Sequence, residues 1–407
     1  MRPTRTRMRR AWVAVAAAGL LTAPAVAGSA YGAATPAPSV SAVPSSDGGT
    51  DFPQLTPAVD AQLDAAVRQV LSDTKVPGVT VGLWAPGKGS YVRSFGVSDK
   101  VTGAAMKPDL GVRIGSETKT FTVTALLQLV DQGKLSLDDP IGKYITGVPN
   151  GNRITLRELA GMRSGLYNYS EDPSFDAKIT STFTPQQLLD ISFKHPVNFA
   201  PNAKFEYSNT NLILLGLVIE KITGRPLHDV INQDVVKAAG LSDRTLFPIG
   251  NEFPEPRAQG YTNDLPGGKI TNATELSPSW AWAAGAMVSD LQDLRSWAKT
   301  VATGTLLKPA TQAQRLKTQP IGIIPGDGYG LGIFNVQGWI GHNGSLPGYE
   351  TLTVYLPQAQ ATMVIMLNTD DLSNGQEPST LFGEAVTRIV TPDHLYPGHK
   401  PVEPKSG

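Results

Sequence analysis

Apolar residues recur every three or four positions in several long segments of the chain. In residues 56–75, Leu63, Val67 and Val70 keep this spacing behind Thr56, a residue type typical of helix caps. The same periodicity predicts helices at residues 120–132, 184–192, 211–222, 291–301 and 381–390.

Short apolar or alternating runs near both ends of the chain are typical of strands. Residues 79–85 and 91–96 are joined by Pro86-Gly87-Lys88-Gly89, a sequence that favours a turn, so we predict an antiparallel hairpin. Residues 351–356 and 363–367 are strand-like as well. Both ends of the chain are therefore expected to contribute to one sheet.

This order of elements predicts an α/β (α+β) fold. We expect an antiparallel sheet built from both chain ends and flanked by helices, together with a mostly helical lobe and a cleft at their junction. One domain over residues 53–395 would comprise a sheet lobe of about 53–115 and 320–395 and a helical lobe of about 116–319. Residues 396–407 would form a C-terminal tail.

The N-terminus has the composition of an export signal. Its first ten residues include five arginines, and an alanine-rich apolar run follows at residues 11–27. This is typical of a secretory signal peptide, which we expect over residues 1–33. The alternative, a membrane anchor, needs about 20 strongly apolar residues, whereas this run is short and contains Pro24. We therefore predict a secreted protein, by either the general or the twin-arginine export route.

Composition narrows the possible functions. Residues 34–52 are rich in Ala, Pro, Ser and Gly and predict a flexible linker. The 407 residues carry 35 basic and 35 acidic side chains, so no overall field attracts nucleic acid. Cysteine is absent and the five histidines lack ligand spacing, so we predict no disulfide, no metal and no cofactor. A monomer without a membrane span is expected after signal cleavage.

Ser116 and Lys119 are candidates for nucleophilic chemistry. Gly115-Ser116-Glu117-Thr118-Lys119 leads directly into an apolar helical segment, where unpaired backbone N–H groups suit a developing oxyanion. Lys119 would lie on the same face one turn deeper, and burial would favour its neutral, basic form. The alternative is a plain helix-capping serine. A second Ser-x-x-Lys, Ser72 to Lys75, falls where a helix is expected to end.

Two further motifs come later in the chain. Tyr207-Ser208-Asn209 precedes an apolar helix, and the Tyr207 phenol could relay a proton, although the tyrosine could instead simply pack beside a capped helix. Gly341-His342-Asn343-Gly344-Ser345 precedes the last strands and could line the cleft. Taken alone, Asn343-Gly344 favours a hairpin turn. His342 could equally be a partly buried polar residue.

In this order the three motifs resemble the signature of the penicillin-recognising serine hydrolases. The chain is most similar to their DD-carboxypeptidase and class C β-lactamase branch. The resemblance spans roughly residues 55–395 and includes the flanking segments 126–135, 163–166 and 279–285. It implies their fold, a serine acyl-enzyme and a small-molecule or peptide substrate.

The resemblance also assigns roles to residues. Ser116 would be acylated, and Lys119 and Tyr207 would share the proton transfers. Asn209 would bind the substrate's amide carbonyl, and the backbone N–H groups of Ser116 and Ser345 would form the oxyanion hole. The other substrate-binding positions that it implies are Trp280 as part of the substrate wall, His342 in place of the usual lysine, and Asn343 and Gly344 of the third motif.

Two departures from the family pattern concern the substrate. Asn343 replaces the usual threonine of the third motif, and residues 332–339 lack the arginine with which related carboxypeptidases bind a carboxylate. The leading prediction is a D-alanyl-D-alanine carboxypeptidase that acts on peptidoglycan stem peptides and binds β-lactams. An esterase, another amidase or a β-lactamase on the same scaffold is the alternative, and a non-catalytic β-lactam-binding or sensing module is a minor one.

Overall fold

The computed structural model describes residues 52–322 and 326–396, which fold around one eight-stranded sheet. Every pair of neighbouring strands in this sheet is antiparallel. In spatial order the strands are β2 (Gly89–Gly96), β1 (Gly78–Ala85), β12 (Ala361–Leu367), β11 (Tyr349–Leu356), β10 (Trp339–Leu346), β9 (Phe334–Val336), β8 (Gly328–Tyr329) and β7 (Gln319–Pro320).

The sheet joins the two ends of the chain. The expected hairpin of β1 and β2 is present, with Val79 opposite Phe95, and β1 then pairs with β12, where Val79 lies opposite Leu367. All eight positions of β1 are buried because helices cover both faces of the sheet there. The predicted fold class, an antiparallel sheet built from both chain ends with flanking helices, is confirmed.

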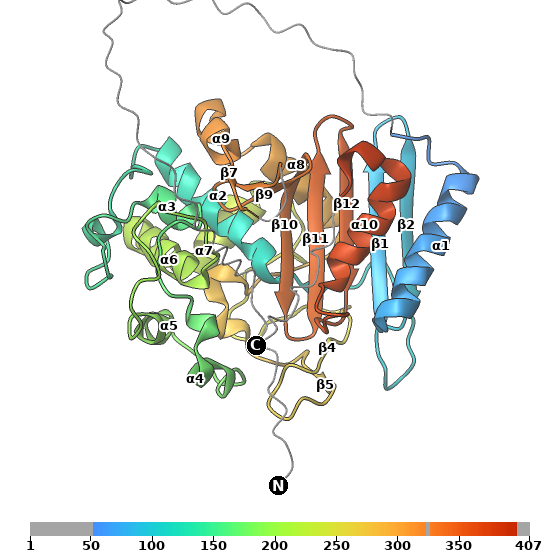
Figure 1. Ribbon diagram of the computed structural model, residues 1–407, viewed down its shortest axis with the longest axis horizontal. Helices are drawn as coiled ribbons and strands as arrows, with labels where there is room; N and C mark the ends of the chain where they lie inside the picture. The colour runs from blue at the N-terminus through green and yellow to red at the C-terminus, as the bar shows by residue number, and fades with distance from the viewer. Residues whose placement is uncertain (1–51, 323–325, 397–407) are drawn as a thin grey trace, which may run out of the picture.

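The helices divide between the two faces of the sheet and a helical part beside it. Figure 1 shows α1 and α10 side by side against one face, and α2 to α7 gathered beside the sheet. The helices are α1 (Pro57–Thr74), α2 (Thr118–Asp131), α3 (Leu156–Ala160), α4 (Pro173–Asp176), α5 (Pro185–Ser192), α6 (Asn209–Thr223), α7 (Leu227–Val230), α8 (Leu291–Thr303), α9 (Pro309–Leu316) and α10 (Pro378–Val390). The six predicted helices correspond to α1, α2, α5, α6, α8 and α10.

The register of β11 shows which helices cover which face. The Leu352 side chain points towards α10, since a Cβ on Gly383 would come within 2.9 Å of it. The neighbouring Thr351 points the other way, and its hydroxyl donates to the Ile114 carbonyl just before α2. Helix α10 and the Ser116 segment therefore lie on opposite faces of the sheet.

The two Ser-x-x-Lys sequences occupy different positions. Ser72 and Lys75 lie on the exposed end of α1, where Lys75 takes the left-handed conformation that ends the helix. Helix α2, in contrast, is buried along nearly its whole length. Its Phe121 stacks on Trp297 of α8 with the ring centroids 3.8 Å apart, which fixes α2 against the core.

Some sequence predictions fall at the limits of the described chain. The predicted signal peptide, linker residues 34–51 and tail residues 397–407 lie outside the described residues. Phe52, the last residue of the predicted linker, and Tyr396, the first of the predicted tail, are both buried in the core. None of the helices within residues 52–322 and 326–396 combines the length and apolar character needed to cross a membrane.

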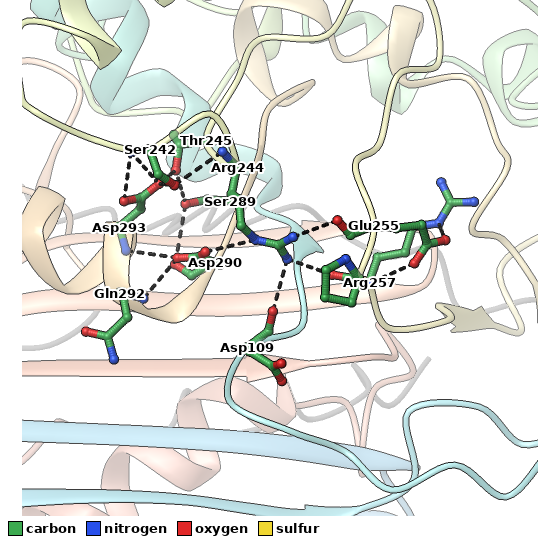
Figure 2. A network of polar contacts seen from close by, with 11 residues as sticks. Asp109, Ser242, Arg244, Thr245, Glu255, Arg257, Ser289, Asp290, Gln292 and Asp293 are labelled. Carbon is green, nitrogen blue, oxygen red and sulfur yellow. Dashed lines mark hydrogen bonds and ion pairs between the residues drawn. The ribbon is translucent and has the colours of Figure 1, made fainter.

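Arg244 anchors the segment that leads to Ser116. In Figure 2 its guanidinium lies among backbone carbonyls and the Asp290 carboxylate. It donates to Asp290 at 3.0 Å and to the carbonyls of Asp109, Glu255 and Pro256 at 3.0, 2.9 and 2.6 Å. Asp109 lies three residues before β3 (Val112–Arg113), so this network fixes the approach of the chain to Ser116.

Replacing Arg244 with alanine should destabilise the fold. Asp290 would keep a partly buried charge without this partner and three carbonyls would lose a donor, so we expect the free energy of unfolding to fall by about 2 to 4 kcal/mol. Urea denaturation measures this. The matched control is Arg153→Ala, because Arg153 is exposed and its loss should cost less than about 0.5 kcal/mol. Equal effects of the two variants would contradict the anchoring role.

Candidate active site

Ser116 lies where the helical part meets the edge of the sheet. It occupies a single turn, η1 (Gly115–Glu117), which runs straight into α2. Gly115 has a φ of +50°, and a Cβ at this position would come within 2.6 Å of the Ser345 backbone nitrogen on β10. Glycine is therefore needed here, and it brings the Ser116 turn against the Ser345 amide.

A second glycine permits the same approach from the side of the sheet. A Cβ on Gly344 would come within 1.9 Å of the Ile114 carbonyl oxygen. Strand β10 pairs with β9 only at residues 339–341, so its later residues reach η1 along an edge that β9 does not cover. The third sequence motif thus meets the first by direct backbone contact.

Lys119 is fully buried beside Ser116. Its Nζ lies 2.8 Å from Ser116 Oγ and donates to the Ala284 carbonyl at 2.7 Å. Burial holds the pKa of Lys119 well below its usual range, and no carboxylate of residues 52–322 and 326–396 is among the causes of this shift. A neutral amine in this place can accept the hydroxyl proton of Ser116.

Tyr207 also lies beside Ser116. Burial raises the pKa of its phenol, while a hydrogen bond with Ser116 acts in the opposite direction. Lys119 Nζ is 4.8 Å from the centroid of the Tyr207 ring. The phenol therefore stays protonated at neutral pH and lies close to both groups, so the predicted Ser116, Lys119 and Tyr207 form one cluster.

His342 is a buried neutral imidazole next to this cluster. Its Nδ1 donates to the Asn343 carbonyl at 2.5 Å, which leaves Nε2 as the acceptor for the Tyr329 hydroxyl at 3.3 Å. Burial lowers the pKa of His342 to about 3, and the positive charge that Lys119 carries once it is protonated at low pH acts in the same direction. His342 is therefore a neutral imidazole near neutral pH.

Asn343 and Gly344 lie within strand β10 and do not form the hairpin turn that the dipeptide alone favours. The turn comes later, between Leu346 and Tyr349. The pattern misleads because sheet pairing with β11 outweighs the local turn preference of Asn-Gly. Asn343 Nδ2 donates to Glu377 Oε2 at 2.7 Å, a contact that sequence analysis could not foresee across 34 residues.

Asn209 begins α6 and is held by a loop. Its Nδ2 donates to Ser170 Oγ at 3.1 Å, and its backbone N–H donates to Asn168 Oδ1 at the same distance. Its Oδ1 is buried and has no hydrogen-bond partner among the described residues. One N–H and one oxygen of the amide thus remain for a substrate.

A small cavity lies beside the Ser116 side chain. Trp280 forms one wall, and the Tyr169 hydroxyl donates to its carbonyl at 2.6 Å and holds the segment in place. The cavity is lined by Ser116, Asn209, Trp280, Ala281, Ala284, Gly285, Ser345 and Leu346. Residues from all three sequence motifs therefore meet around it, since Ser116, Asn209 and Ser345 belong to one motif each.

Glu117 is a feature that sequence analysis passed over. Its side chain is buried under β11, and neither carboxyl oxygen has a normal hydrogen bond within the described part of the chain. Burial raises the pKa of Glu117 to about 8, which the Thr351 and Thr353 hydroxyls partly offset. The only signal in the sequence was an acidic residue at the start of an otherwise apolar helix.

Comparison with known proteins identifies the class to which this site belongs. The model of the Beta-lactamase family matches residues 63–382, and the chain belongs to this family. Fold and site together define a serine hydrolase of the β-lactamase and penicillin-binding protein superfamily. The family resemblance drawn from the sequence is confirmed.

Among solved structures, a D-stereospecific amidohydrolase from Streptomyces sp. is 32% identical, covering 76% of this chain and 94% of that one, with a TM-score of 0.71. The D-amino acid amidase of Ochrobactrum anthropi SV3, solved with L-phenylalanine amide, is 28% identical over 82% of this chain and 97% of that one, with a TM-score of 0.69. Protein flp of Staphylococcus aureus strain N315 is 24% identical over 324 residues, 77% of this chain. The match spans only 64% of the length of flp.

The raised pKa of Glu117 predicts how the stability of the fold depends on pH. The unfolded carboxyl ionises near pH 4.5 and the folded one near pH 8, so the folded state retains a proton that the unfolded state has lost. Stability should therefore fall as the pH rises through this window, by up to about 1.4 kcal/mol per pH unit from this group.

Urea denaturation between pH 5 and 8 tests this, with Glu117→Gln compared with the wild type. The variant should lose this part of the slope and gain relative stability towards pH 8. The control is Glu252→Gln, because Glu252 is exposed and should keep the wild-type slope. A slope that Glu117→Gln leaves unchanged would show that Glu117 is ionised in the fold.

Proposed function

We propose that this chain is an exported serine hydrolase that cleaves the amide bond following a D-amino acid residue through an acyl-enzyme on Ser116. The observation that carries the proposal is the 2.8 Å contact between Ser116 Oγ and the buried amine of Lys119. A buried lysine without a carboxylate partner is costly to keep charged, so its presence is best explained by use as a base.

In the proposed acylation step, Lys119 Nζ takes the hydroxyl proton as Ser116 Oγ attacks the substrate carbonyl. The negative charge that develops on the carbonyl oxygen is stabilised by the backbone N–H groups of Ser116 and Ser345. The leaving nitrogen then receives a proton from Lys119, relayed by the Tyr207 hydroxyl, and the C–N bond breaks. A water molecule, activated by the same groups, hydrolyses the ester and restores Ser116.

Two substrate classes fit this chemistry. D-amino acid amides are favoured by the similarity to a D-stereospecific amidohydrolase and a D-amino acid amidase, and by the lack of a cation in residues 332–339. A D-alanyl-D-alanine carboxypeptidase that acts on peptidoglycan stem peptides and is acylated by β-lactams is the second candidate, favoured by the ordered motifs of the family. Secretion through a signal peptide over residues 1–33, and a monomeric state, remain predictions.

The first test is mass spectrometry of the mature protein after brief exposure to a β-lactam, combined with turnover of D-phenylalanine amide. We expect a covalent adduct on the wild type, none on Ser116→Ala, and a loss of amide turnover of at least about 1,000-fold in that variant. Ser72→Ala is the matched control, because Ser72 belongs to the exposed Ser-x-x-Lys of α1 and should leave both results unchanged.

The other outcomes separate the alternatives. Brisk ester hydrolysis without amide turnover would favour an esterase, and rapid loss of a β-lactam adduct would favour a β-lactamase. A stable adduct with no turnover of amide, peptide or ester would indicate a binding or sensing module and overturn the proposed hydrolysis.

A second test uses pH dependence. Because the reaction needs neutral Lys119, kcat/KM should fall on the acid side as this amine becomes protonated, at a pH well below the usual range for lysine. Lys119→Arg replaces the neutral amine with a guanidinium that stays protonated, so the base is lost and kcat should fall by about 100- to 10,000-fold. His342→Gln should leave the position of the acid limb unchanged, since His342 titrates only near pH 3. An acid limb that moves in His342→Gln would contradict this assignment.

A further inference from the structure

Residues 168–170 support two walls of the Ser116 cavity without lining it. The Tyr169 hydroxyl donates to the Trp280 carbonyl at 2.6 Å, and Asn168 and Ser170 both contact Asn209 at the start of α6. Trp280 and Asn209 line the cavity, whereas none of residues 168–170 is among the described residues around it. This segment therefore acts on a substrate through the residues that it holds.

The segment is itself anchored on both sides. All three of its residues are buried, and the Tyr169 backbone N–H donates to Thr210 Oγ1 at 3.2 Å. Asp172, two residues beyond the segment, has its Oδ2 2.6 Å from Nε2 of His195, which follows α5. These contacts fix the position of Ser170 relative to α6.

Hydrogen bonds in this segment determine which way the Asn209 carboxamide is turned. The backbone N–H of Asn209 can only donate, so the Asn168 atom that receives it at 3.1 Å is the carbonyl oxygen Oδ1. The same oxygen lies 3.0 Å from Ser170 Oγ, so the single hydroxyl proton of Ser170 must point to it. Ser170 Oγ then faces Asn209 as an acceptor, and the Asn209 atom 3.1 Å away must be the amide nitrogen Nδ2.

Ser170 makes the only side-chain contact within the described residues that distinguishes the two ends of this carboxamide. Asn209 Nδ2 donates to it, while Asn209 Oδ1 is buried and has no hydrogen-bond partner in residues 52–322 and 326–396. Without the Ser170 hydroxyl, no hydrogen bond in this part of the chain would favour one orientation of the amide over the other.

The orientation matters because Asn209 lines the cavity beside Ser116. A carboxamide has donors at one end and an acceptor at the other, and the two ends are similar in size. A substrate group that pairs with one end would meet the wrong partner if the amide turned over. It would then lose a hydrogen bond and leave a buried polar group unpaired, which weakens binding.

We infer that Ser170 is a positioning residue for substrate binding, because its hydroxyl, aligned by Asn168, holds the Asn209 carboxamide in a single orientation. Its hydrogen bonds go to Asn168 and Asn209 and leave the reacting groups of the site untouched, so its effect falls on binding and not on the chemical step. This inference rests on the proposed acyl-enzyme function of Ser116, and it adds a residue that lies outside the three sequence motifs.

The test measures KM and kcat for D-phenylalanine amide with the wild type, Ser170→Ala, Asn209→Ala and the double variant. Ser170→Ala should raise KM about three- to tenfold, because one hydrogen bond is lost and the amide is free to turn, while kcat should change by less than about twofold. In the Asn209→Ala background, Ser170→Ala should raise KM no further, because no carboxamide is left to orient.

Two further measurements check the same assignment. Asn168→Ala leaves Ser170 in place but removes the oxygen that aligns its proton, so it should also raise KM. The β-lactam concentration that gives half the maximal rate of adduct formation on Ser116 should follow the same pattern as KM across all variants.

Ser164→Ala is the matched control. Ser164 is also a buried serine that holds an asparagine of α6, through a hydrogen bond of 2.6 Å to Asn211 Oδ1, but Asn211 is not among the described residues that line the cavity. Both serine variants lose a buried hydrogen bond and should unfold at a lower temperature than the wild type. KM should stay within about twofold of the wild type in Ser164→Ala alone, which separates positioning from stability.

The other outcomes are distinct. An unchanged KM in Ser170→Ala, an equal rise in Ser164→Ala, or an equal rise with and without the Asn209 side chain would overturn the inference while Ser116-dependent cleavage continued. If the wild type neither cleaved D-phenylalanine amide nor formed a Ser116 adduct, the proposed function itself would fail.

Discussion

The burial of Lys119 is the constraint on which the rest of the site depends. A fully buried amine is tolerated in its neutral form, and the Ala284 carbonyl and Ser116 Oγ supply its polar contacts. This requires α2 to run through the core, which its stacking on α8 secures. The same burial keeps the Tyr207 phenol protonated and His342 neutral, so one dry environment sets the protonation states of three groups.

Close backbone contact between β10 and the Ser116 turn is the second structural constraint on the site. Gly115 and Gly344 both lack a side chain where a Cβ would collide with the opposite backbone. Their small size allows two amides from distant parts of the chain to lie next to one another, as an oxyanion hole requires. Because β10 belongs to a sheet closed by both chain ends, this contact is fixed by the fold as a whole.

Much of the site could be predicted because its motifs lie where local patterns are strong. Ser116 and Lys119 lie at the start of one apolar helix and Tyr207 and Asn209 at the start of another, and the order of the three motifs resembles that of the penicillin-recognising serine hydrolases, which implied a shared site. Asn343-Gly344 shows the limit of local reasoning, since strand pairing overrode its turn preference. Glu117 shows another limit, because its burial under Thr351 and Thr353 depends on a strand more than 230 residues away.

The sequence by itself determined the order of helices and strands, the fold class and the residues that gather around Ser116, because hydrophobic periodicity and short motifs act locally. Only the tertiary structure decided the protonation states of the residues in the site. It buried Lys119, His342 and Glu117, and it placed Glu377 on Asn343 from a helix on the other face of the sheet. The physical reason is that pKa values depend on dehydration and on neighbours through space, which no spacing along the chain specifies.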